Sequence, residues 1–411
     1  MNSNSVWNIT CGSNRLDGTV QLPDSKSVAN RLQIIHFIGG FSPLSIDDGA
    51  PDDIAELHSA LFALSSGDTE IDVGNGGTSY RFAVAAAAFK NIACTLISGE
   101  QMQNRPIGEL IEPLIQLGAK IEYVNKHGFP PVKIVSGVNG GETEVSTQNS
   151  GQYASAIALS APALPKRTVL HFPYEITSKP YFDMTLHLMR LCGAKFDFAG
   201  NKLTIEPWNY SNPGAEHLEK DLSAASYFYQ LAALSEKAEI TLAGAANAIH
   251  QGDKAASKYF EFFGVVTKKC GSDLVIIKPE NAKPKTGTFR ADLRSTPDLA
   301  QTLACTCAGT GVPCELTGLH TLKIKETDRI AALNNELQKL NCEIESGEGF
   351  IVIQPKGNLP SGIRVKSYND HRMVMALAPL ALKTGDLEIE GWECVSKSFP
   401  GFKNEFERLT I

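Results

Sequence analysis

Apolar positions along the chain recur in one order: an apolar helix ends at a turn, and a pair of extended segments follows it. The helix ends lie at Gly118, Gly193, Gly264 and Asn341. The second extended segments lie at 132–135, 203–205, 274–277 and 350–353. Successive helix ends are 75, 71 and 77 residues apart, so one unit is about 75 residues of mixed helix and strand.

The first unit is shorter than the others. A similar helix end at Gly67 precedes Gly118 by only 51 residues, and the hairpin is missing there. The 411 residues then hold five to six units. We therefore predict an α/β fold with two similar domains of three units each, the first unit shortened. Pro, Gly and polar residues at 211–222 and near 16–22 are typical of crossings between domains.

Composition narrows the classes of partner. The hydrophobic content of 43% and the charged content of 20% are those of a soluble globular protein. A net charge of -7 argues against general binding to nucleic acid or to an anionic membrane. The nine cysteines are scattered without a zinc-binding pair, so we expect no metal and mostly buried thiols. The first residues lack a signal-peptide pattern, and no segment has the ~20 apolar residues of a membrane span, which predicts a cytoplasmic protein.

The stretch 325–329, Lys-Glu-Thr-Asp-Arg, places two carboxylates between two cations just before a helix with apolar residues at helical spacing. Thr327 and Asp328 are candidates for the helix cap. Backbone N–H groups and the helix dipole favour an anion close to Lys325 and Arg329. A solvated, charged helix start is the competing interpretation.

Other predicted helices also begin with polar residues that suit an anion. These residues are Lys26, Ser27 and Arg31, the glycine-rich stretch 72–81 with Asn75 and Gly77, Arg105, Ser150 with Gln152, and Ser178 with Tyr181. Each start taken alone is as consistent with an ordinary capped helix or glycine turn. Together they predict one divided anion site.

The second half of the chain adds further charged helix starts. Asp298 opens an apolar helix, where a cap and a catalytic carboxylate are both consistent with the pattern. His371 and Arg372 stand at the head of the buried run 373–382, where a charge is costly unless it has a partner. Lys397 is unremarkable in isolation.

Ten segments follow one another along nearly the whole chain: LPDSKSVANR, GNGGTSYR, NRPIG, SGQ before an apolar helix, SKPYFDMTLHLM, DLSAASYF, STPDLAQTLA, KETDRIAAL, YNDHRMVMALAPLAL and SKSFPGF. In this order they resemble the 5-enolpyruvylshikimate-3-phosphate synthase family of enolpyruvyl transferases. Helix caps alone do not explain ten ordered matches.

The resemblance implies two domains, each of three β-α-β-α-β-β units with helices inside and sheets outside, an inside-out α/β barrel. The N-terminal domain would comprise residues 16–219, and the C-terminal domain 1–15 plus 220–411. The active site would lie in the cleft between them, and the domains would close on substrate. A monomer is implied.

The implied reaction moves the enolpyruvyl group of phosphoenolpyruvate to the 5-hydroxyl of shikimate 3-phosphate and releases phosphate, a step toward chorismate and the aromatic amino acids. It is an addition followed by an elimination through a tetrahedral intermediate. The hydroxyl loses a proton, the methylene carbon gains one, and cations hold the departing phosphate. No metal or organic cofactor is implied.

Site residues carried over by motif fall into three sets. Phosphoenolpyruvate would be held by Lys26, Arg105, Gln152, Arg329, Arg372, Lys397 and the backbone at Asn75 and Gly77. Shikimate 3-phosphate would be held by Lys26, Ser27, Arg31, Ser150, Gln152, Ser178, Tyr181, Asp298 and Lys325. The proton-handling candidates are Asp298, Glu326 and Lys26, with His371 assisting. We favour Asp298 for the hydroxyl and Glu326 for the methylene carbon.

Several positions depart from the family pattern, among them Asp24 and Gly151. Asp24 stands where glycine is usual, and Gly151 replaces a serine.

Two alternatives bear on function. A sibling enzyme that uses UDP-N-acetylglucosamine has a cysteine acid in the loop corresponding to 100–105, which contains no cysteine here. A catalytically inactive binding protein would have no need to retain Lys26, Asp298 and Glu326 together with the arginines.

Overall fold

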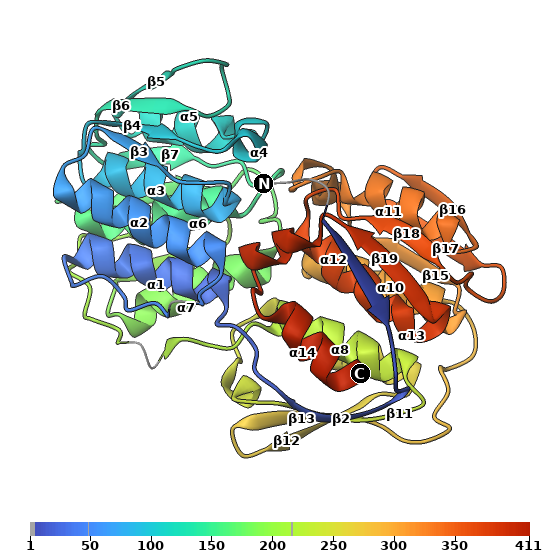
Figure 1. Ribbon diagram of the computed structural model, residues 1–411. Coiled ribbons are helices and arrows are strands. Elements are labelled where there is room, and N and C mark those ends of the chain that lie inside the picture. The colour runs from blue at the N-terminus through green and yellow to red at the C-terminus, as the bar shows by residue number, and fades with distance from the viewer. Residues whose placement is uncertain (1–4, 48, 215–216) are drawn as a thin grey trace. The chain divides into compact units, whose positions relative to one another are not determined.

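The computed structural model describes residues 5–47, 49–214 and 217–411. Internal contacts divide the chain into two compact units. The N-terminal unit is Ser25–Leu218, and the C-terminal unit combines the residues up to Asp24 with Glu219–Ile411 (Figure 1).

The first boundary differs from the predicted one at residue 16. Strand β2 (Arg15–Val20) pairs in parallel with β11 (Lys237–Leu242), so the residues up to Asp24 group with the C-terminal unit. The second boundary, after Leu218, lies one residue before the predicted one.

Within its described residues, the N-terminal unit contains two four-stranded sheets and six longer helices. The sheets have the orders β3 (Glu70–Asp72), β4 (Cys94–Ile97), β6 (Val132–Ser136), β5 (Lys120–Tyr123), and β7 (Gly141–Glu144), β8 (Thr168–His171), β10 (Lys202–Ile205), β9 (Phe196–Ala199). The helices are α1 (Lys26–Gly39), α2 (Asp52–Ser66), α3 (Gly77–Phe89), α5 (Gly108–Gln116), α6 (Gln152–Ser160) and α7 (Lys179–Leu191), with the short α4 (Glu100–Gln103) and η1 (Ala161–Ala163).

The described part of the C-terminal unit contains three sheets. Their orders are β12 (Val266–Cys270), β13 (Asp273–Lys278), β11, β2; then β14 (Phe289–Asp292), β15 (Cys314–Thr317), β17 (Phe350–Pro355), β16 (Cys342–Gly347); and β1 (Val6–Thr10), β19 (Asp386–Glu390), β18 (Ile363–Lys366). The α-helices are α8 (Leu222–Leu234), α9 (Ala256–Phe260), α10 (Ala300–Thr310), α11 (Arg329–Lys339), α12 (His371–Leu377), α13 (Ala381–Thr384) and α14 (Phe402–Thr410). Short 3-10 helices are η3 (Ala245–Asn247), η4 (Gly252–Ala255), η5 (Glu261–Phe263), η6 (Pro297–Leu299), η7 (His320–Ile324), η8 (Ala378–Leu380) and η9 (Trp392–Lys397).

The predicted repeating unit is present in the four-stranded sheets. In one of them β14 and β15 are parallel and are joined through α10, while β16 and β17 form an antiparallel hairpin after α11. The order is therefore β-α-β-α-β-β, as predicted. The first unit is shortened as expected, because the described residues between 26 and 66 form two helices and no strand.

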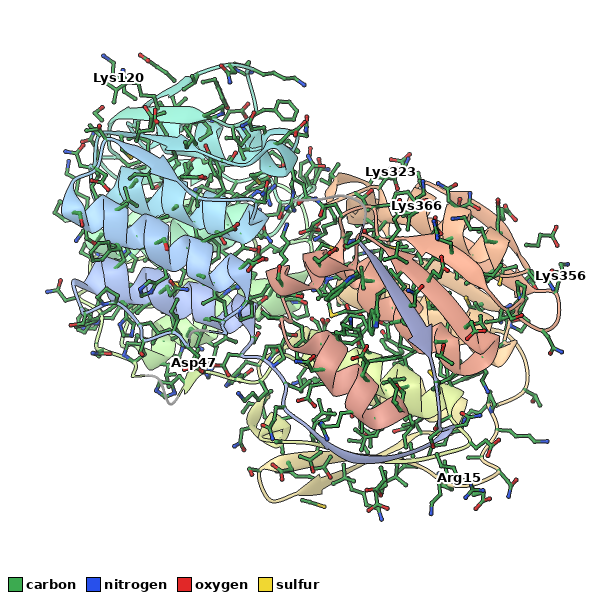
Figure 2. The ribbon with its side chains drawn as sticks, in the orientation of Figure 1. Arg15, Asp47, Lys120, Lys323, Lys356 and Lys366 are labelled. Carbon is green, nitrogen blue, oxygen red and sulfur yellow. The ribbon has the colours of Figure 1, made fainter. Side chains whose placement is uncertain are left out.

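The most buried helices lie at the centre of each unit, because apolar residues occupy most of the positions around them. Every residue of α8 and of α12 is buried, and so is every residue of α6 after its first residue, Gln152. Exposed basic side chains such as Lys120 in β5 and Arg15 in β2 project from the sheets instead (Figure 2). Each unit thus has its own hydrophobic core. The core holds the helices in place, and with them the helix starts that carry the predicted site residues.

Two expectations from composition concern the whole chain. Cysteines are free thiols, and six of the nine are buried, as expected. Among the helices of the described residues, none is long and apolar enough to cross a membrane.

Candidate active site

Arg329 lies at the centre of a charged cluster in the C-terminal unit. It is the first residue of α11, whose cap is Asp328: the Asp328 side chain accepts a hydrogen bond from the Ala331 N–H at 3.1 Å, which confirms one of the two predicted cap residues. The Arg329 side chain points inward and is 1% exposed. A buried cation requires partners.

Three carboxylates surround the Arg329 guanidinium. Its Nε donates to Asp370 Oδ2 at 2.7 Å, and its Nη2 donates to Glu326 Oε2 at 2.8 Å. Its Nη1 donates to Asp298 Oδ1 at 3.2 Å. Burial acts to lower the pKa of Arg329, but the charges of these carboxylates outweigh it and raise the pKa. Arg329 is therefore a permanent cation.

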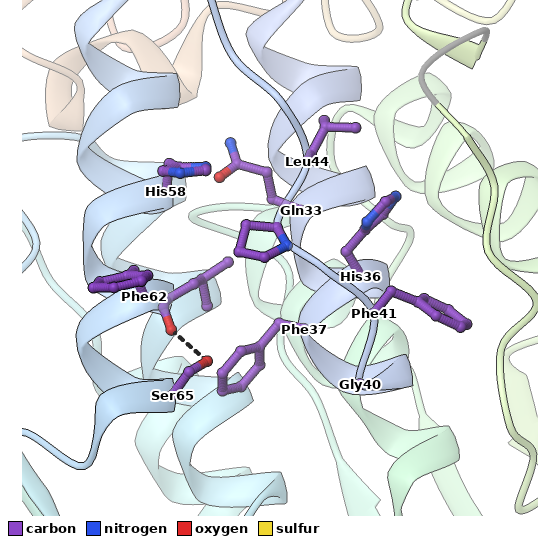
Figure 3. Close-up of a pocket in the computed structure, with 11 residues that line it drawn as sticks. Gln33, His36, Phe37, Gly40, Phe41, Leu44, His58, Phe62 and Ser65 are labelled. Atoms are coloured by element: carbon purple, nitrogen blue, oxygen red, sulfur yellow. Dashed lines mark hydrogen bonds between the residues drawn. The ribbon is translucent and has the colours of Figure 1, made fainter.

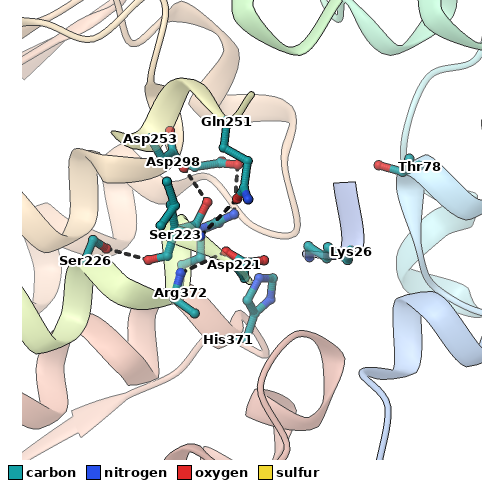
Figure 4. Close-up of polar contacts among 12 residues, drawn as sticks. Lys26, Thr78, Asp221, Ser223, Ser226, Gln251, Asp253, Asp298, His371 and Arg372 are labelled. Atoms are coloured by element: carbon teal, nitrogen blue, oxygen red, sulfur yellow. Dashed lines mark hydrogen bonds and ion pairs between the residues drawn. The ribbon is translucent and has the colours of Figure 1, made fainter. Parts of the chain in front are cut away.

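Asp298 bridges two arginines, because its second oxygen, Oδ2, accepts from Arg372 Nη2 at 2.8 Å (Figure 4). The cap interpretation of Asp298 is not the one observed: α10 has Leu299 at its N-cap, and the Asp298 carboxylate binds guanidinium groups instead. The prediction that Arg372 needs a partner at the head of a buried helix is confirmed.

Glu326 lies between two cations. One oxygen accepts from Arg329, and the other is 3.6 Å from Lys397 Nζ. The Glu326 and Lys397 side chains are each 9% exposed, so both charges are largely withdrawn from water. Lys325 is half-buried at the end of η7 next to this pair.

Asp370 also belongs to this cluster, although the sequence alone predicts no role for it. It is fully buried, caps α12 by accepting from the Arg372 N–H at 2.9 Å, and accepts from Arg329. The signal was an aspartate directly before a buried helix, which is a common cap. His371 is also buried, with its Nδ1 3.9 Å from Asp370 Oδ1.

A second buried carboxylate, Asp253 in η4, lies near Asp298 (Figure 4). It accepts a short hydrogen bond from the Ser223 hydroxyl. Burial, followed by the negative charge of Asp298, raises the pKa of Asp253 to about 6. Nothing in the local sequence distinguishes Asp253 from any other aspartate in a turn.

Lys26 is the centre of a smaller charged group in the N-terminal unit. It is the first residue of α1, and its Nζ lies 2.7 Å from Asp53 Oδ2. Asp53 is buried in the first turn of α2, and its backbone carbonyl accepts from the Ser79 hydroxyl at 2.8 Å. Asp53 was missed because an acidic residue in a first helical turn is ordinary.

Arg31 joins α1 to α7 from a buried position. Its guanidinium donates to the carbonyls of Ser27 at 2.6 Å and Tyr181 at 3.0 Å, and to Thr185 Oγ1 at 2.7 Å. Burial lowers the pKa of Arg31 to about 10. The predicted residues Ser27, Arg31 and Tyr181 therefore do lie together. Ser178 precedes α7 with a φ of 54°, in the left-handed region.

Ser150 and Gln152 meet at the start of α6, as predicted. The Gln152 N–H donates to Ser150 Oγ at 3.2 Å, and its side-chain amide donates to Thr78 Oγ1 at 2.8 Å. Arg81 Nη1 donates to Gln152 Oε1 at 2.6 Å, which fixes the orientation of that amide. Thr78 and Arg81 follow the glycine-rich stretch noted in the sequence.

The glycine-rich stretch before α3 has two parts. The N–H groups of Asn75 and Gly76 donate to the two carboxylate oxygens of Glu56 at 3.1 and 3.0 Å. Gly77 packs against the buried guanidinium of Arg105, with which a Cβ atom at position 77 would clash. The structure thus brings Gly77 and Arg105 together. It also places the Glu56 carboxylate against the backbone N–H of Asn75.

Asp24 and Gly151, which depart from the family pattern, have local explanations. Asp24 Oδ1 lies 2.8 Å from Lys220 Nζ, so its charge is paired within the C-terminal unit. Gly151 lies against the backbone carbonyl of Thr177, with which a Cβ atom would clash. A glycine here therefore accommodates the close approach of the 177–178 backbone.

A pocket of about 300 Å³ lies elsewhere in the N-terminal unit, between the end of α1, the following loop and α2 (Figure 3). Aromatic residues and two histidines, His36 and His58, form its walls. It contains none of the predicted site residues. No group of three or more His, Cys, Asp or Glu side chains suited to a metal ion occurs among the residues that the structure describes.

Comparisons with known proteins place these clusters in context. The sequence matches the family model of EPSP synthase (3-phosphoshikimate 1-carboxyvinyltransferase) over residues 49–406. A 3-phosphoshikimate 1-carboxyvinyltransferase from Bacteroides fragilis is 36% identical over 406 residues, covering 96% of this chain and 95% of the relative. One from an Enterobacter species is 30% identical over 421 residues, covering 96% and 97%.

Solved structures give the same fold. EPSP synthase from Acinetobacter baumannii has a TM-score of 0.76 at 22% identity, with 98% of both chains covered. An enolpyruvyl transferase from Streptomyces tendae has a TM-score of 0.72 at 15% identity, with 99% of this chain and 98% of the other covered. These likenesses confirm the predicted two-domain α/β fold.

Proposed function

Because the chain belongs to the EPSP synthase (3-phosphoshikimate 1-carboxyvinyltransferase) family, we propose that it transfers the enolpyruvyl group of phosphoenolpyruvate to the 5-hydroxyl of shikimate 3-phosphate and releases phosphate. The family match and the names of these relatives favour this acceptor over a UDP-linked sugar. We also propose that the protein works in the cytoplasm as a monomer.

The observation that carries the proposal is the pair of carboxylates, Asp298 and Glu326, each held by Arg329 and a second cation. The reaction needs a group that accepts the hydroxyl proton and a group that gives a proton to the methylene carbon. We assign the first role to Asp298 and the second to Glu326. A fixed guanidinium beside each carboxylate keeps it in place while the proton moves.

Arg329, Arg372 and Lys397 would bind phosphoenolpyruvate. Cations at these positions stabilise the charge that develops on the departing phosphate, an interaction that is stronger where water is excluded. All three are largely buried, which supports this assignment. Their present bonds to Asp298 and Glu326 imply that the substrate replaces or shares part of these ion pairs.

Most of the residues that would bind shikimate 3-phosphate belong to the N-terminal unit. Gln152 and Ser150 are oriented by Arg81 and Thr78, which supports a fixed polar contact to shikimate 3-phosphate. Ser27, Ser178, Tyr181 and, from the C-terminal unit, Lys325 complete that proposed set. The donors of Arg31 already bind Ser27, Tyr181 and Thr185, so Arg31 would act mainly by holding these segments.

Gly77 with Arg105 would form a further contact to phosphoenolpyruvate, and Lys26 would contact both substrates. Close packing of the guanidinium on the glycine supports the first assignment. Glu56 already accepts from the Asn75 N–H, so binding of an anion at Asn75 would require displacement of that carboxylate. Lys26 and His371 would assist the proton transfers.

The proposal is tested by mixing the purified full chain with shikimate 3-phosphate and phosphoenolpyruvate and following phosphate release. We expect release that depends on both substrates. A matched pair of variants locates the site: Glu326→Gln should abolish most of the activity, whereas Glu343→Gln, at an exposed ion pair with Lys356, should retain it. Folded protein without any release would refute the proposal.

A further inference from the structure

Glu336 in α11 is a buried carboxylate that lies outside the predicted set of site residues. Its side chain is fully buried. It accepts from the Tyr368 hydroxyl at 2.6 Å, from the Lys366 N–H at 3.1 Å and from Lys339 Nζ at 2.6 Å. A buried carboxylate is costly without partners, and two of these three donors belong to one short segment of the chain.

That segment, residues 366–372, contains an unusual backbone turn. Tyr368 and Asn369 are consecutive and have φ angles of 55° and 54°, in the left-handed region that residues with a Cβ atom rarely adopt. Such a conformation persists only where the surroundings hold it in place. The Glu336 carboxylate holds the segment on one side of the turn through the Lys366 N–H and within it through the Tyr368 ring.

The same helix holds the other side of the turn. Arg329 and Glu336 are seven residues apart on α11, about two turns, so they project from one face of the helix. Arg329 donates to Asp370, and Glu336 accepts from Lys366 and Tyr368. α11 is therefore hydrogen-bonded to the 366–372 segment at two points, through Arg329 and through Glu336.

The position of the turn sets the position of Arg372. Asp370 follows the turn directly and caps α12 through the Arg372 N–H. Arg372 in turn donates to Asp298 at 2.8 Å. A shift of the turn would move Asp370 away from Arg329 and Arg372 away from Asp298, and misplacement by about 1 Å can cost an enzyme about a hundredfold in rate.

We infer that Glu336 is a positioning residue of the active site, which holds the strained turn at Tyr368 and Asn369 so that Asp370 and Arg372 meet Arg329 and Asp298. The inference rests on the proposed function, because its effect is measured as a change in the kinetic constants for phosphoenolpyruvate. Within the described residues, the hydrogen bonds and the ion pair of Glu336 join it to Lys339, Lys366 and Tyr368, and none of these three is a proposed substrate-binding residue.

Two variants of the full chain test the inference. Glu336→Gln keeps the shape and removes the charge, and Tyr368→Phe removes only the hydroxyl that bonds to Glu336. We expect each variant to lower kcat and to raise KM for phosphoenolpyruvate. In each variant kcat/KM should fall by about tenfold or more. The dissociation constant of shikimate 3-phosphate alone, measured by calorimetry, should change less than about twofold, since most of its proposed contacts lie in the N-terminal unit.

Lys339→Met is the matched control, because it removes the third partner of Glu336, a side chain that is 39% exposed, and leaves the turn bonds intact. It should retain wild-type kinetics. Wild-type kinetics in both Glu336→Gln and Tyr368→Phe would overturn the inference, and so would an equal loss in Lys339→Met. If Glu336→Gln does not fold, Tyr368→Phe alone decides. An inactive wild-type protein would instead refute the proposed function.

Discussion

Arg329 carries a charge inside the protein because three carboxylates compensate it. Breaking one member of such a buried set leaves the others uncompensated, which is typically more costly than removing the whole set. Each carboxylate also has a second contact, to Arg372, to Lys397 or to a helix N–H. The cluster is therefore a connected network in which geometry and charge depend on each other.

Glu326 tests the catalytic assignment at the residue scale. Glu326→Gln keeps the volume and one acceptor for Arg329 but cannot give a proton to carbon. We expect kcat to fall by about a hundredfold or more, as the loss of a general acid predicts. Steady-state phosphate release measures it, and circular dichroism checks the fold. Wild-type turnover in this variant would reduce Glu326 to a structural partner of Arg329.

Asp253 gives a prediction about stability and pH. Its pKa in the folded protein is raised from 3.8 to about 6, so between these pH values the folded state binds more protons than the unfolded state. Stability therefore falls as pH rises through this window, and the full penalty remains above pH 6. Asp253→Asn, which can still accept from Ser223, should raise the free energy of unfolding at pH 8 by about 1 to 3 kcal/mol.

Urea unfolding of both proteins at pH 8 and pH 5 measures this difference. The gain from Asp253→Asn should be smaller at pH 5, where the folded wild type already holds a proton on Asp253. A loss of stability at pH 8, or a gain that grows toward acid pH, would contradict the assigned pKa direction.

Asp298 and Asp370 show which residue contacts can be predicted from the sequence and which cannot. The need of Arg372 for a partner followed from a charge at the head of an apolar helix, and Asp298 was already a candidate. Asp370 and Asp53 resemble ordinary helix-start residues, and their partners Arg329 and Lys26 lie 41 and 27 residues away. Local pattern cannot distinguish a cap from a long-range ion pair.

Helix starts are the elements that carry the site. In α11 and α12 the charged residues occupy the first turn, and apolar residues behind them anchor the helix in the core. Helical periodicity predicted these starts well. It could not predict the left-handed turn at Tyr368 and Asn369, because tyrosine has no preference for that conformation and the contacts to Glu336 impose it.

The start of α6 provides a prediction at the element scale. Gly151→Ser restores the residue that is usual in the family, but its Cβ would clash with the Thr177 carbonyl. Overpacking of this kind costs about 1 to 3 kcal/mol. We expect a lower free energy of unfolding and, because Ser178 is next in the chain, a higher KM for shikimate 3-phosphate.

Gly49→Ala is the matched control, since no atom of the described residues, apart from its chain neighbours, lies within 4 Å of a Cβ atom at that position. It should leave both quantities unchanged. Unfolding in urea and steady-state kinetics provide the two readouts. A Gly151→Ser protein that is as stable as wild type and binds shikimate 3-phosphate more tightly would show that the close approach of Thr177 is easily relieved.

The whole molecule is two α/β units with separate cores. Their repeat could be predicted because each unit repeats the same order of helix, turn and hairpin. The boundary after Asp24 could not, because β2 pairs with β11 in the other half of the chain, and such a pairing leaves no local signal.

Net charge gives a prediction for the whole molecule. The chain carries -7, yet both proposed substrates are anions, so local cations must overcome the overall field. Raising NaCl from about 0.05 to 0.5 M shortens the Debye length from about 14 to 4 Å. We expect KM for both substrates to rise several-fold while kcat changes little. Potassium glutamate at equal ionic strength separates screening from chloride binding, and a KM independent of both salts would contradict local cationic capture.

The most direct test of the central claim is phosphate release by the purified full chain with shikimate 3-phosphate and phosphoenolpyruvate together. The assignment predicts release that requires both compounds, yields one enolpyruvyl ether per phosphate, and is lost in Glu326→Gln but not in Glu343→Gln. Folded wild-type protein that releases no phosphate, or releases it without shikimate 3-phosphate, would contradict it.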